Sequence, residues 1–188
     1  MRKLLVSVLE VAEVVVVALG AVFVVRSFLV QPFLVSGASM APSFENGNYL
    51  LVDELTYRFR PPERGEVVVF RYPNDESTYF IKRIVGLPGD RIVIKDGVVT
   101  VVSPAHPEGE RLTEPYLAAG MTTAVRRQDE ANVTLGPGEY FVLGDNRSYS
   151  FDSRDWGPLK TTEIIGLVRL RLWPLTGLTV FAAPRYST

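Results

Sequence analysis

The stretch Arg91-Ile92-Val93-Ile94-Lys95-Asp96-Gly97-Val98-Val99-Thr100-Val101 decides the class of fold. Two runs rich in β-branched residues, which favour strands, flank the pair Asp96-Gly97. A two-residue type I′ turn prefers this pair because both of its central residues have positive φ. The stretch therefore predicts a β-hairpin.

Other short segments rich in Val, Ile, Tyr and Phe lie on both sides of this hairpin, with turn residues between them. No repeat of about 20 to 50 residues is visible, which argues against a solenoid or a propeller. We therefore predict a mainly β protein with an antiparallel β-sheet or partly open barrel. The expected strands are 48–52, 66–72, 78–85, 91–95, 98–102, 139–143 and 164–173.

Three further segments, one after the hairpin and two near the C-terminus, carry predictions of their own. Residues 103–138 contain several prolines and few apolar runs, which predicts a loop-rich insertion. The sequence does not indicate a function for it. The last long strand alternates apolar residues with Arg169 and Arg171, which we expect to be solvated rather than ligand-binding. Residues 175–183 are apolar but too short to cross a membrane, so they form either a last strand or a surface that rests on lipid.

The composition limits the possible functions. The 188 residues, 47% of them hydrophobic, suit one domain plus an anchoring segment. A net charge of -1 offers no broad attraction for nucleic acid. The chain has no cysteine, which excludes disulfides, thiol nucleophiles and thiolate metal sites but leaves the compartment open. The only histidine, His106, lies between prolines in an expected surface loop, which favours a mobile histidine over a catalytic one.

The N-terminal segment predicts a membrane anchor. Arg2 and Lys3 precede an apolar stretch over 4–25, which as a helix would be about 33 Å long and could cross a bilayer core of about 30 Å. Glu10 and Glu13 interrupt it, so they must be protonated, lie near the cytoplasmic interface or face a partner helix. We therefore divide the chain into an anchor over 1–30 and an extracytoplasmic β-rich domain over 31–188.

A cleaved signal peptide would share the same basic start and short apolar run. A retained anchor is favoured because the candidate nucleophile, Ser39, follows closely and residues 28–34 continue the apolar character. With the two basic residues inside, everything after Arg26 would lie outside the cytoplasm, with membrane lipid as a partner.

Three separated segments carry the residues for a serine-based chemistry. Ser39 lies in Val35-Ser36-Gly37-Ala38-Ser39-Met40-Ala41-Pro42, where small residues leave space for another backbone. Lys82 lies in an expected strand, on the same face as Phe80 and Ile84, and an apolar setting would lower the pKa of its amine toward neutrality. A surface lysine is the alternative. The third segment, 144–157, is a dense polar run that predicts an organised turn network.

Together these segments resemble the bacterial type I signal peptidases, a family of serine-lysine peptidases. Residues 39–43 look like the family's serine box, 64–70 its following strand, 79–90 its lysine box and 144–157 its last box. The motifs occur in the family's order after a hydrophobic segment, and the resemblance covers nearly the whole chain.

The resemblance implies a catalytic role for Ser39 as nucleophile and Lys82 as general base, acting through an acyl-enzyme without a metal or other cofactor. It implies cleavage of signal peptides from exported preproteins at the outer face of the bacterial cytoplasmic membrane, by a single-pass enzyme. Three further residues correspond to family positions at the site: Ser150 would orient the lysine, and Asp152 and Arg154 would support it by ion pairing.

Arg83 and Asp145 join that expected supporting network. The oxyanion hole would use the backbone of Ser39 and the position of Gly37, where some family members carry a serine and no hydroxyl is available here. The family accepts small residues of the Ala-x-Ala type before the cut, in shallow apolar pockets that Val35, Met40 and Ile81 would line.

Three other kinds of protein share part of this pattern, and the sequence argues against each of them. Self-cleaving repressors share the serine-lysine chemistry but carry a DNA-binding domain, for which this chain has no room. The relatives in eukaryotic secretory membranes use histidine where Lys82 stands. A catalytically inactive, membrane-tethered β domain that binds an extracytoplasmic partner would have no reason to keep Ser39, Lys82 and Ser150 together.

Overall fold

The computed structural model describes residues 7, 9–20, 30–125, 130–174 and 177–181. Residues 9–20 are helical and their side chains are exposed. Within the described residues, no helix combines the length and the apolar character needed to cross a membrane. Residues 1–6, 8 and 21–29 of the predicted anchor lie outside the described part of the chain.

The domain after this helix is mainly β and antiparallel, as the sequence predicts, but its strands form two sheets. The larger sheet has the strand order β1-β2-β11-β3-β4-β9-β10, with β12 paired to β11. Register shifts that mark bulges or irregularities interrupt the pairing of β4 with both β3 and β9, and such shifts bend and twist a sheet. Its strands are β1 (Val30–Leu34), β2 (Tyr49–Asp53), β3 (Val67–Tyr72), β4 (Asp75–Gly86), β9 (Glu139–Leu143), β10 (Leu159–Lys160), β11 (Ile164–Trp173) and β12 (Thr179–Val180).

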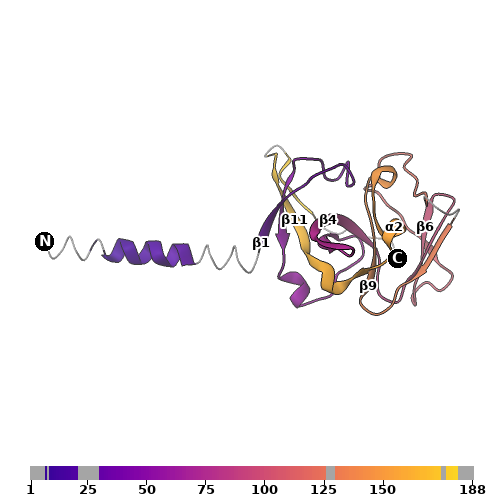
Figure 1. The fold of residues 1–188 in the computed structure, drawn as a ribbon, viewed down its shortest axis with the longest axis horizontal. Coiled ribbons are helices and arrows are strands. Elements are labelled where there is room, and N and C mark those ends of the chain that lie inside the picture. Colours follow the sequence, from indigo (N-terminus) through magenta and orange to yellow (C-terminus); the bar gives the residue numbers. More distant parts are fainter. Residues whose placement is uncertain (1–6, 8, 21–29, 126–129, 175–176, 182–188) are drawn as a thin grey trace.

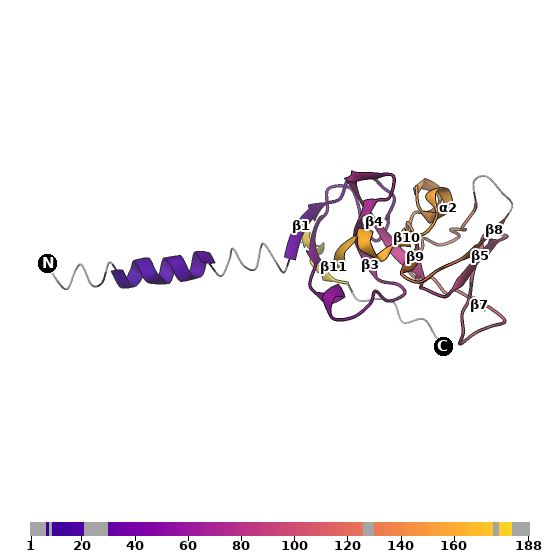
Figure 2. The same cartoon turned by 60° about the horizontal axis from the view of Figure 1, so that its bottom comes forward.

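The smaller sheet has the order β7-β6-β5-β8. Its strands are β5 (Arg91–Lys95), β6 (Val98–Val102), β7 (Glu110–Arg111) and β8 (Glu130–Thr134). It lies beside the end of the larger sheet that carries β9 (Figures 1 and 2). The helical turns are η1 (Thr56–Arg58), η2 (Arg147–Tyr149), α2 (Ser153–Trp156) and η3 (Thr161–Glu163).

The predicted hairpin is confirmed residue by residue. Strands β5 and β6 pair from Arg91 with Val102 to Lys95 with Val98. Asp96 and Gly97 have φ values of 51° and 78°, the left-handed backbone that a type I′ turn requires. The local sequence therefore determines this element.

Several sequence predictions need correction. Strand β1 begins at Val30, which the sequence analysis placed at the end of the anchor. The 103–138 insertion also supplies β7 and β8, whose weakly apolar sequences gave no strand signal. Of the two alternatives given for residues 175–183, the last strand is borne out rather than corrected, since residues 179–180 form the short β12.

The two arginines of β11 make specific contacts rather than being merely solvated. Arg169 Nε lies 3.1 Å from Asp53 Oδ2, on the neighbouring strand β2. Arg171 donates to the backbone oxygens of Gly177 at 2.8 Å and Ser43 at 3.2 Å. The alternation of apolar and basic residues along the strand predicts that both arginines point away from the core. It cannot show which loops cover them.

Strand β3 separates two apolar cores of the larger sheet. Val67 and Val69 pack in one core with Met40 and Phe44, whereas Val68 and Phe70 pack on the opposite face. A third core joins the smaller sheet to the end of the larger one; its buried members are Val85, Ile92, Ile94, Val99, Val101, Leu135, Phe141 and Leu143. Burial of these side chains holds both sheets in a fixed relation, since each buried aliphatic or aromatic side chain contributes about 1.5–3 kcal/mol.

Gly97, the turn glycine of the hairpin, allows the effect of a steric clash on stability to be separated from the effect of backbone strain. A Cβ at Gly97 would lie 2.9 Å from Thr122 Cβ, whereas one at Gly89, with a similar φ of 88°, would meet nothing within 4 Å. We expect Gly89→Ala to lower the free energy of unfolding by about 1–2 kcal/mol through backbone strain alone. Gly97→Ala should lower it by about 1 kcal/mol more because of the clash, as measured by chemical denaturation. Equal losses would show that Thr122 gives way freely.

Candidate active site

The structure brings Ser39 and Lys82 together although 43 positions separate them. Lys82 Nζ donates to Ser39 Oγ at 2.8 Å and to the backbone oxygen of Ile81 at 2.9 Å. Strand β4 carries the lysine, and its ammonium group lies 5.2 Å from the ring centroid of Phe80 on the same face. A nucleophilic hydroxyl and a potential base are therefore within hydrogen-bond reach of each other.

Burial sets the protonation of this lysine. The Lys82 residue is only 3% exposed. Desolvation lowers the pKa of Lys82 to about 8, because an ammonium group loses hydration when it is buried. The negative charges of Asp152 and Asp145 act in the opposite direction. A substantial fraction of the amine is therefore neutral slightly above physiological pH.

The loop that carries Ser39 is held from both sides. On the inner side, Met40 and Phe44 are fully buried in the first core. On the outer side, Asn146 donates its backbone N–H to Ser39 O and its side-chain amide to Ala38 O, both at 3.0 Å. The serine is thus fixed between the core and the 144–157 segment.

Arg83, the residue after the lysine, forms a buried ion pair with Asp145. Its Nε and Nη2 donate to the two carboxylate oxygens at 2.8 and 2.6 Å, and Nη1 donates to Gly65 O at 2.8 Å. Such a two-pronged pair fixes orientation as well as charge. It joins strand β4 to the start of the 144–157 segment.

Asp152 and Arg154 organise the other end of that segment. Asp152 caps helix α2 and accepts two bonds of 2.8 Å from the Arg154 guanidinium and one of 3.0 Å from the Gly144 N–H. Burial would raise the pKa of Asp152, but Arg154, Gly144 and the Ser150 hydroxyl hold that pKa below its usual value. The carboxylate therefore stays charged near Lys82.

Ser150 is fully buried and its hydroxyl interacts with Asp152. A Cβ at Gly144 would lie 2.1 Å from Ser150 Oγ and 2.5 Å from Ser39 O. Only glycine therefore allows the Ser39 loop and the Ser150 turn to approach this closely.

No role for Gly144, Asn146 or Arg147 was predictable from the sequence, although all three lie in the polar run over 144–157. The density of polar residues there was the available signal. Arg147 is buried and binds Glu114 of the insertion, and nothing in the sequence around Glu114 indicated that contact.

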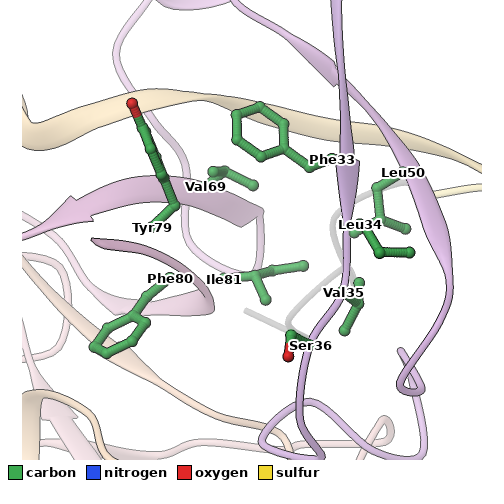
Figure 3. Close-up of a pocket in the computed structure, with 9 residues that line it drawn as sticks. All are labelled: Phe33, Leu34, Val35, Ser36, Leu50, Val69, Tyr79, Phe80 and Ile81. Atoms are coloured by element: carbon green, nitrogen blue, oxygen red, sulfur yellow. The ribbon is translucent and has the colours of Figure 1, made fainter. Parts of the chain in front are cut away.

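An apolar groove of about 110 Å³ is lined by residues that shortly precede Ser39 and Lys82 in the chain, among them Val35, Ser36 and Ile81 (Figure 3). Val35 and Ile81, two of the three predicted pocket residues, line it from opposite sides. Met40 does not line this groove but lies in the core beneath, where it is 1% exposed. An apolar residue next to the candidate nucleophile can point toward the groove or into the core, and only packing shows which.

The remaining predicted positions are also placed. Gly37 has a φ of 98°, and its N–H donates to Asn46 Oδ1 at 3.0 Å, so this N–H already has an acceptor. His106 lies in the insertion with Nδ1 3.5 Å from Glu110 Oε2. In the described part of the chain, no group of three or more His, Asp or Glu side chains could hold a metal ion.

Comparison with known proteins shows the family of this chain. Residues 8–173 match the family model described as signal peptidase, peptidase S26. The chain is 37% identical over 167 residues to signal peptidase I of Bacillus caldolyticus, covering 84% of this chain and 87% of that protein. It is 34% identical over 173 residues to a probable signal peptidase I-2 of Synechocystis sp., covering 89% and 74%. A crystal structure of a signal peptidase I from Enterococcus faecalis V583 is 28% identical, with a TM-score of 0.47, covering 57% of this chain and 97% of that one.

The protein is therefore a hydrolase of the serine peptidase class. The chain belongs to the signal peptidase family, peptidase S26.

The buried lysine should lower stability at neutral pH. Its pKa is about 8 in the folded protein and 10.5 when solvated, so between these pH values the unfolded chain binds one more proton and stability rises with pH. We expect Lys82→Met to be more stable relative to wild type at pH 7 than at pH 10.5, the difference between the two pH values being of the order of 3 kcal/mol. Urea unfolding over this pH range measures it.

Lys95→Met is the matched control, because Lys95 lies on strand β5 with a 63% exposed side chain. Its effect on stability should vary little with pH. A Lys82→Met effect that is equally independent of pH would contradict the lowered pKa.

Proposed function

We propose that this protein is a membrane-tethered serine endopeptidase that removes N-terminal signal peptides from exported preproteins. Ser39 is the nucleophile and Lys82 the general base, and cleavage follows small residues of the Ala-x-Ala type. The observation that carries the proposal is the 2.8 Å contact between Lys82 Nζ and Ser39 Oγ within a buried site.

The reaction follows from that contact. The neutral Lys82 amine takes the proton of the Ser39 hydroxyl as Oγ attacks the scissile carbonyl carbon. The resulting ammonium gives this proton to the nitrogen of the leaving chain, and the C–N bond breaks to leave an ester on Ser39. Lys82 then activates a water molecule, which hydrolyses the ester and frees the signal peptide.

The developing oxyanion needs hydrogen-bond donors. The backbone N–H of Ser39 supplies one in this proposal. The Gly37 N–H is held by Asn46 Oδ1 at 3.0 Å, so it would have to break that bond to supply the second. The preference for small apolar residues before the cut is the one that the family resemblance implies, and the groove lined by Val35 and Ile81 offers such residues an apolar surface.

Attachment to the cytoplasmic membrane, with the catalytic domain on the extracytoplasmic face, rests on the N-terminal segment. Along residues 9–20, large apolar side chains are 49–68% exposed, which is unfavourable in water and suits a lipid environment. The basic residues Arg2 and Lys3 precede this helix, as expected for a cytoplasmic end.

Replacement of either reacting residue tests the chemistry. Ser39→Ala and Lys82→Ala should each reduce cleavage of a preprotein with an Ala-x-Ala site by about 10³-fold or more, since either change removes the attack step. The measurement is product formation by gel or mass spectrometry. His106→Ala should retain full activity, because His106 contacts Glu110 in the insertion. Full activity of Lys82→Ala would reject the proposed base.

The pH dependence tests the state of the lysine. Because the neutral amine is the reactive form, kcat/KM should rise with pH through about 8, the pKa of Lys82. The charge of Asp145 raises the pKa of Lys82, so Asp145→Asn should move this rise to lower pH. A shift in the opposite direction would contradict the assignment of the rise to Lys82.

A further inference from the structure

The part of the insertion over 112–123 is fixed to the predicted hairpin at both ends. Leu112 donates its N–H to Val99 O and Thr123 donates its N–H to Gly97 O, each at 2.9 Å. Leu112 also packs against the third core. The loop between these two anchors is therefore supported by the smaller sheet.

Glu114, inside that loop, pairs with a fully buried arginine of the polar segment. Arg147 Nη1 donates to Glu114 Oε2 at 2.9 Å and Nη2 donates to Oε1. The side chains are 0% and 9% exposed for Arg147 and Glu114. A buried guanidinium without a counter-charge would be strongly unfavourable, so Glu114 is required for Arg147 to stay in place.

Arg147 passes this constraint to the reacting groups. Its Nε donates to Gly144 O at 3.0 Å. Gly144 is the residue whose lack of a side chain lets Ser150 and the backbone of Ser39 approach each other. Displacement of Arg147 would therefore release the turn that packs against the nucleophile.

Tyr116 makes a second connection from the same loop. Its hydroxyl donates to Glu114 Oε1 at 2.7 Å, and the Arg83 guanidinium lies 3.9 Å from its ring centroid. This distance is that of a cation–π contact. Since Arg83 follows Lys82 on strand β4, the loop contacts both chain segments that frame the site.

We propose that Glu114 and Tyr116 are positioning residues: through Arg147 and Arg83 they hold the 144–150 turn and strand β4 at the separation that brings Ser39 and Lys82 together. The 112–123 loop of the insertion then supports the catalytic site, whereas the rest of the insertion is not part of this proposal. This inference rests on the proposed peptidase function.

The test compares Glu114→Gln with wild type on one signal-peptide substrate, using the full chain well below the unfolding temperature of each variant. We expect kcat to fall about 10- to 100-fold, since a small misplacement of reacting groups has an effect of this size. KM should stay within about twofold, because the groove residues are not contacted. A purely structural role would lower the unfolding temperature and leave kcat per folded molecule unchanged, which would overturn the inference.

Glu110→Gln is the matched control, because Glu110 belongs to the same insertion and pairs with His106. It should retain the wild-type kcat. Arg147→Met tests whether Glu114 acts through Arg147. If it does, adding Glu114→Gln to Arg147→Met should not lower kcat further. Independent, multiplying losses would overturn the proposed route.

A second pair of variants decides the question if Glu114→Gln does not fold. Tyr116→Phe keeps the ring against Arg83, whereas Tyr116→Leu removes it, so kcat should fall more in the leucine variant. Equal wild-type values for both would overturn the role of Tyr116. If the wild type itself cleaves no signal peptide, the proposed function fails. If it cleaves and the Glu114 and Tyr116 variants match it, only the positioning inference fails.

Discussion

The amine of Lys82 lies 2.8 Å from Ser39 Oγ and is almost completely withdrawn from water. Withdrawal of a cation from water is unfavourable, and two carboxylates, Asp145 and Asp152, partly offset it. These carboxylates are in turn fixed by Arg83 and Arg154. The buried lysine thus depends on two carboxylates for counter-charge, and an arginine holds each carboxylate in place. The same burial brings the pKa of the lysine into the range useful for proton transfer.

This arrangement explains why a peptidase site needs both sheets. The larger sheet supplies Lys82 on β4 and the core beneath Ser39, whereas the smaller sheet supports the loop that carries Glu114 and Tyr116. The segment over 144–157 contacts what each sheet supports: Asn146 binds the serine loop, and Arg147 binds the insertion. Arg154 also donates to Ala124 O at 2.8 Å, which adds a further link to the insertion. The hairpin around Asp96-Gly97 therefore carries none of the reacting groups but is connected to them through the loop that carries Glu114.

Much of the fold could be predicted because its signals are local. Strands β5, β6, β9 and β11 have the predicted bounds, since runs of β-branched and aromatic residues end there at turn residues. Strand β8 was missed because Glu130–Thr134 has few such residues, and it forms by pairing with β5. Met40 was assigned to the pocket for a similar reason: its apolar character was visible, but its direction depends on Phe44 and the first core.

The sequence by itself determined the mainly β class and the hairpin, because strand periodicity and turn chemistry are properties of neighbouring residues. It also offered Ser39 and Lys82 as candidates from their local surroundings, whereas Ser150 was a candidate only through the resemblance to the family. Only the tertiary structure decided that Lys82 is buried, that Gly144 permits the close approach of Ser39 and Ser150, and that Glu114 neutralises Arg147. Desolvation and ion pairing depend on which distant segments exclude water from a side chain and which charge they bring to it. Those quantities exist only once the chain has folded.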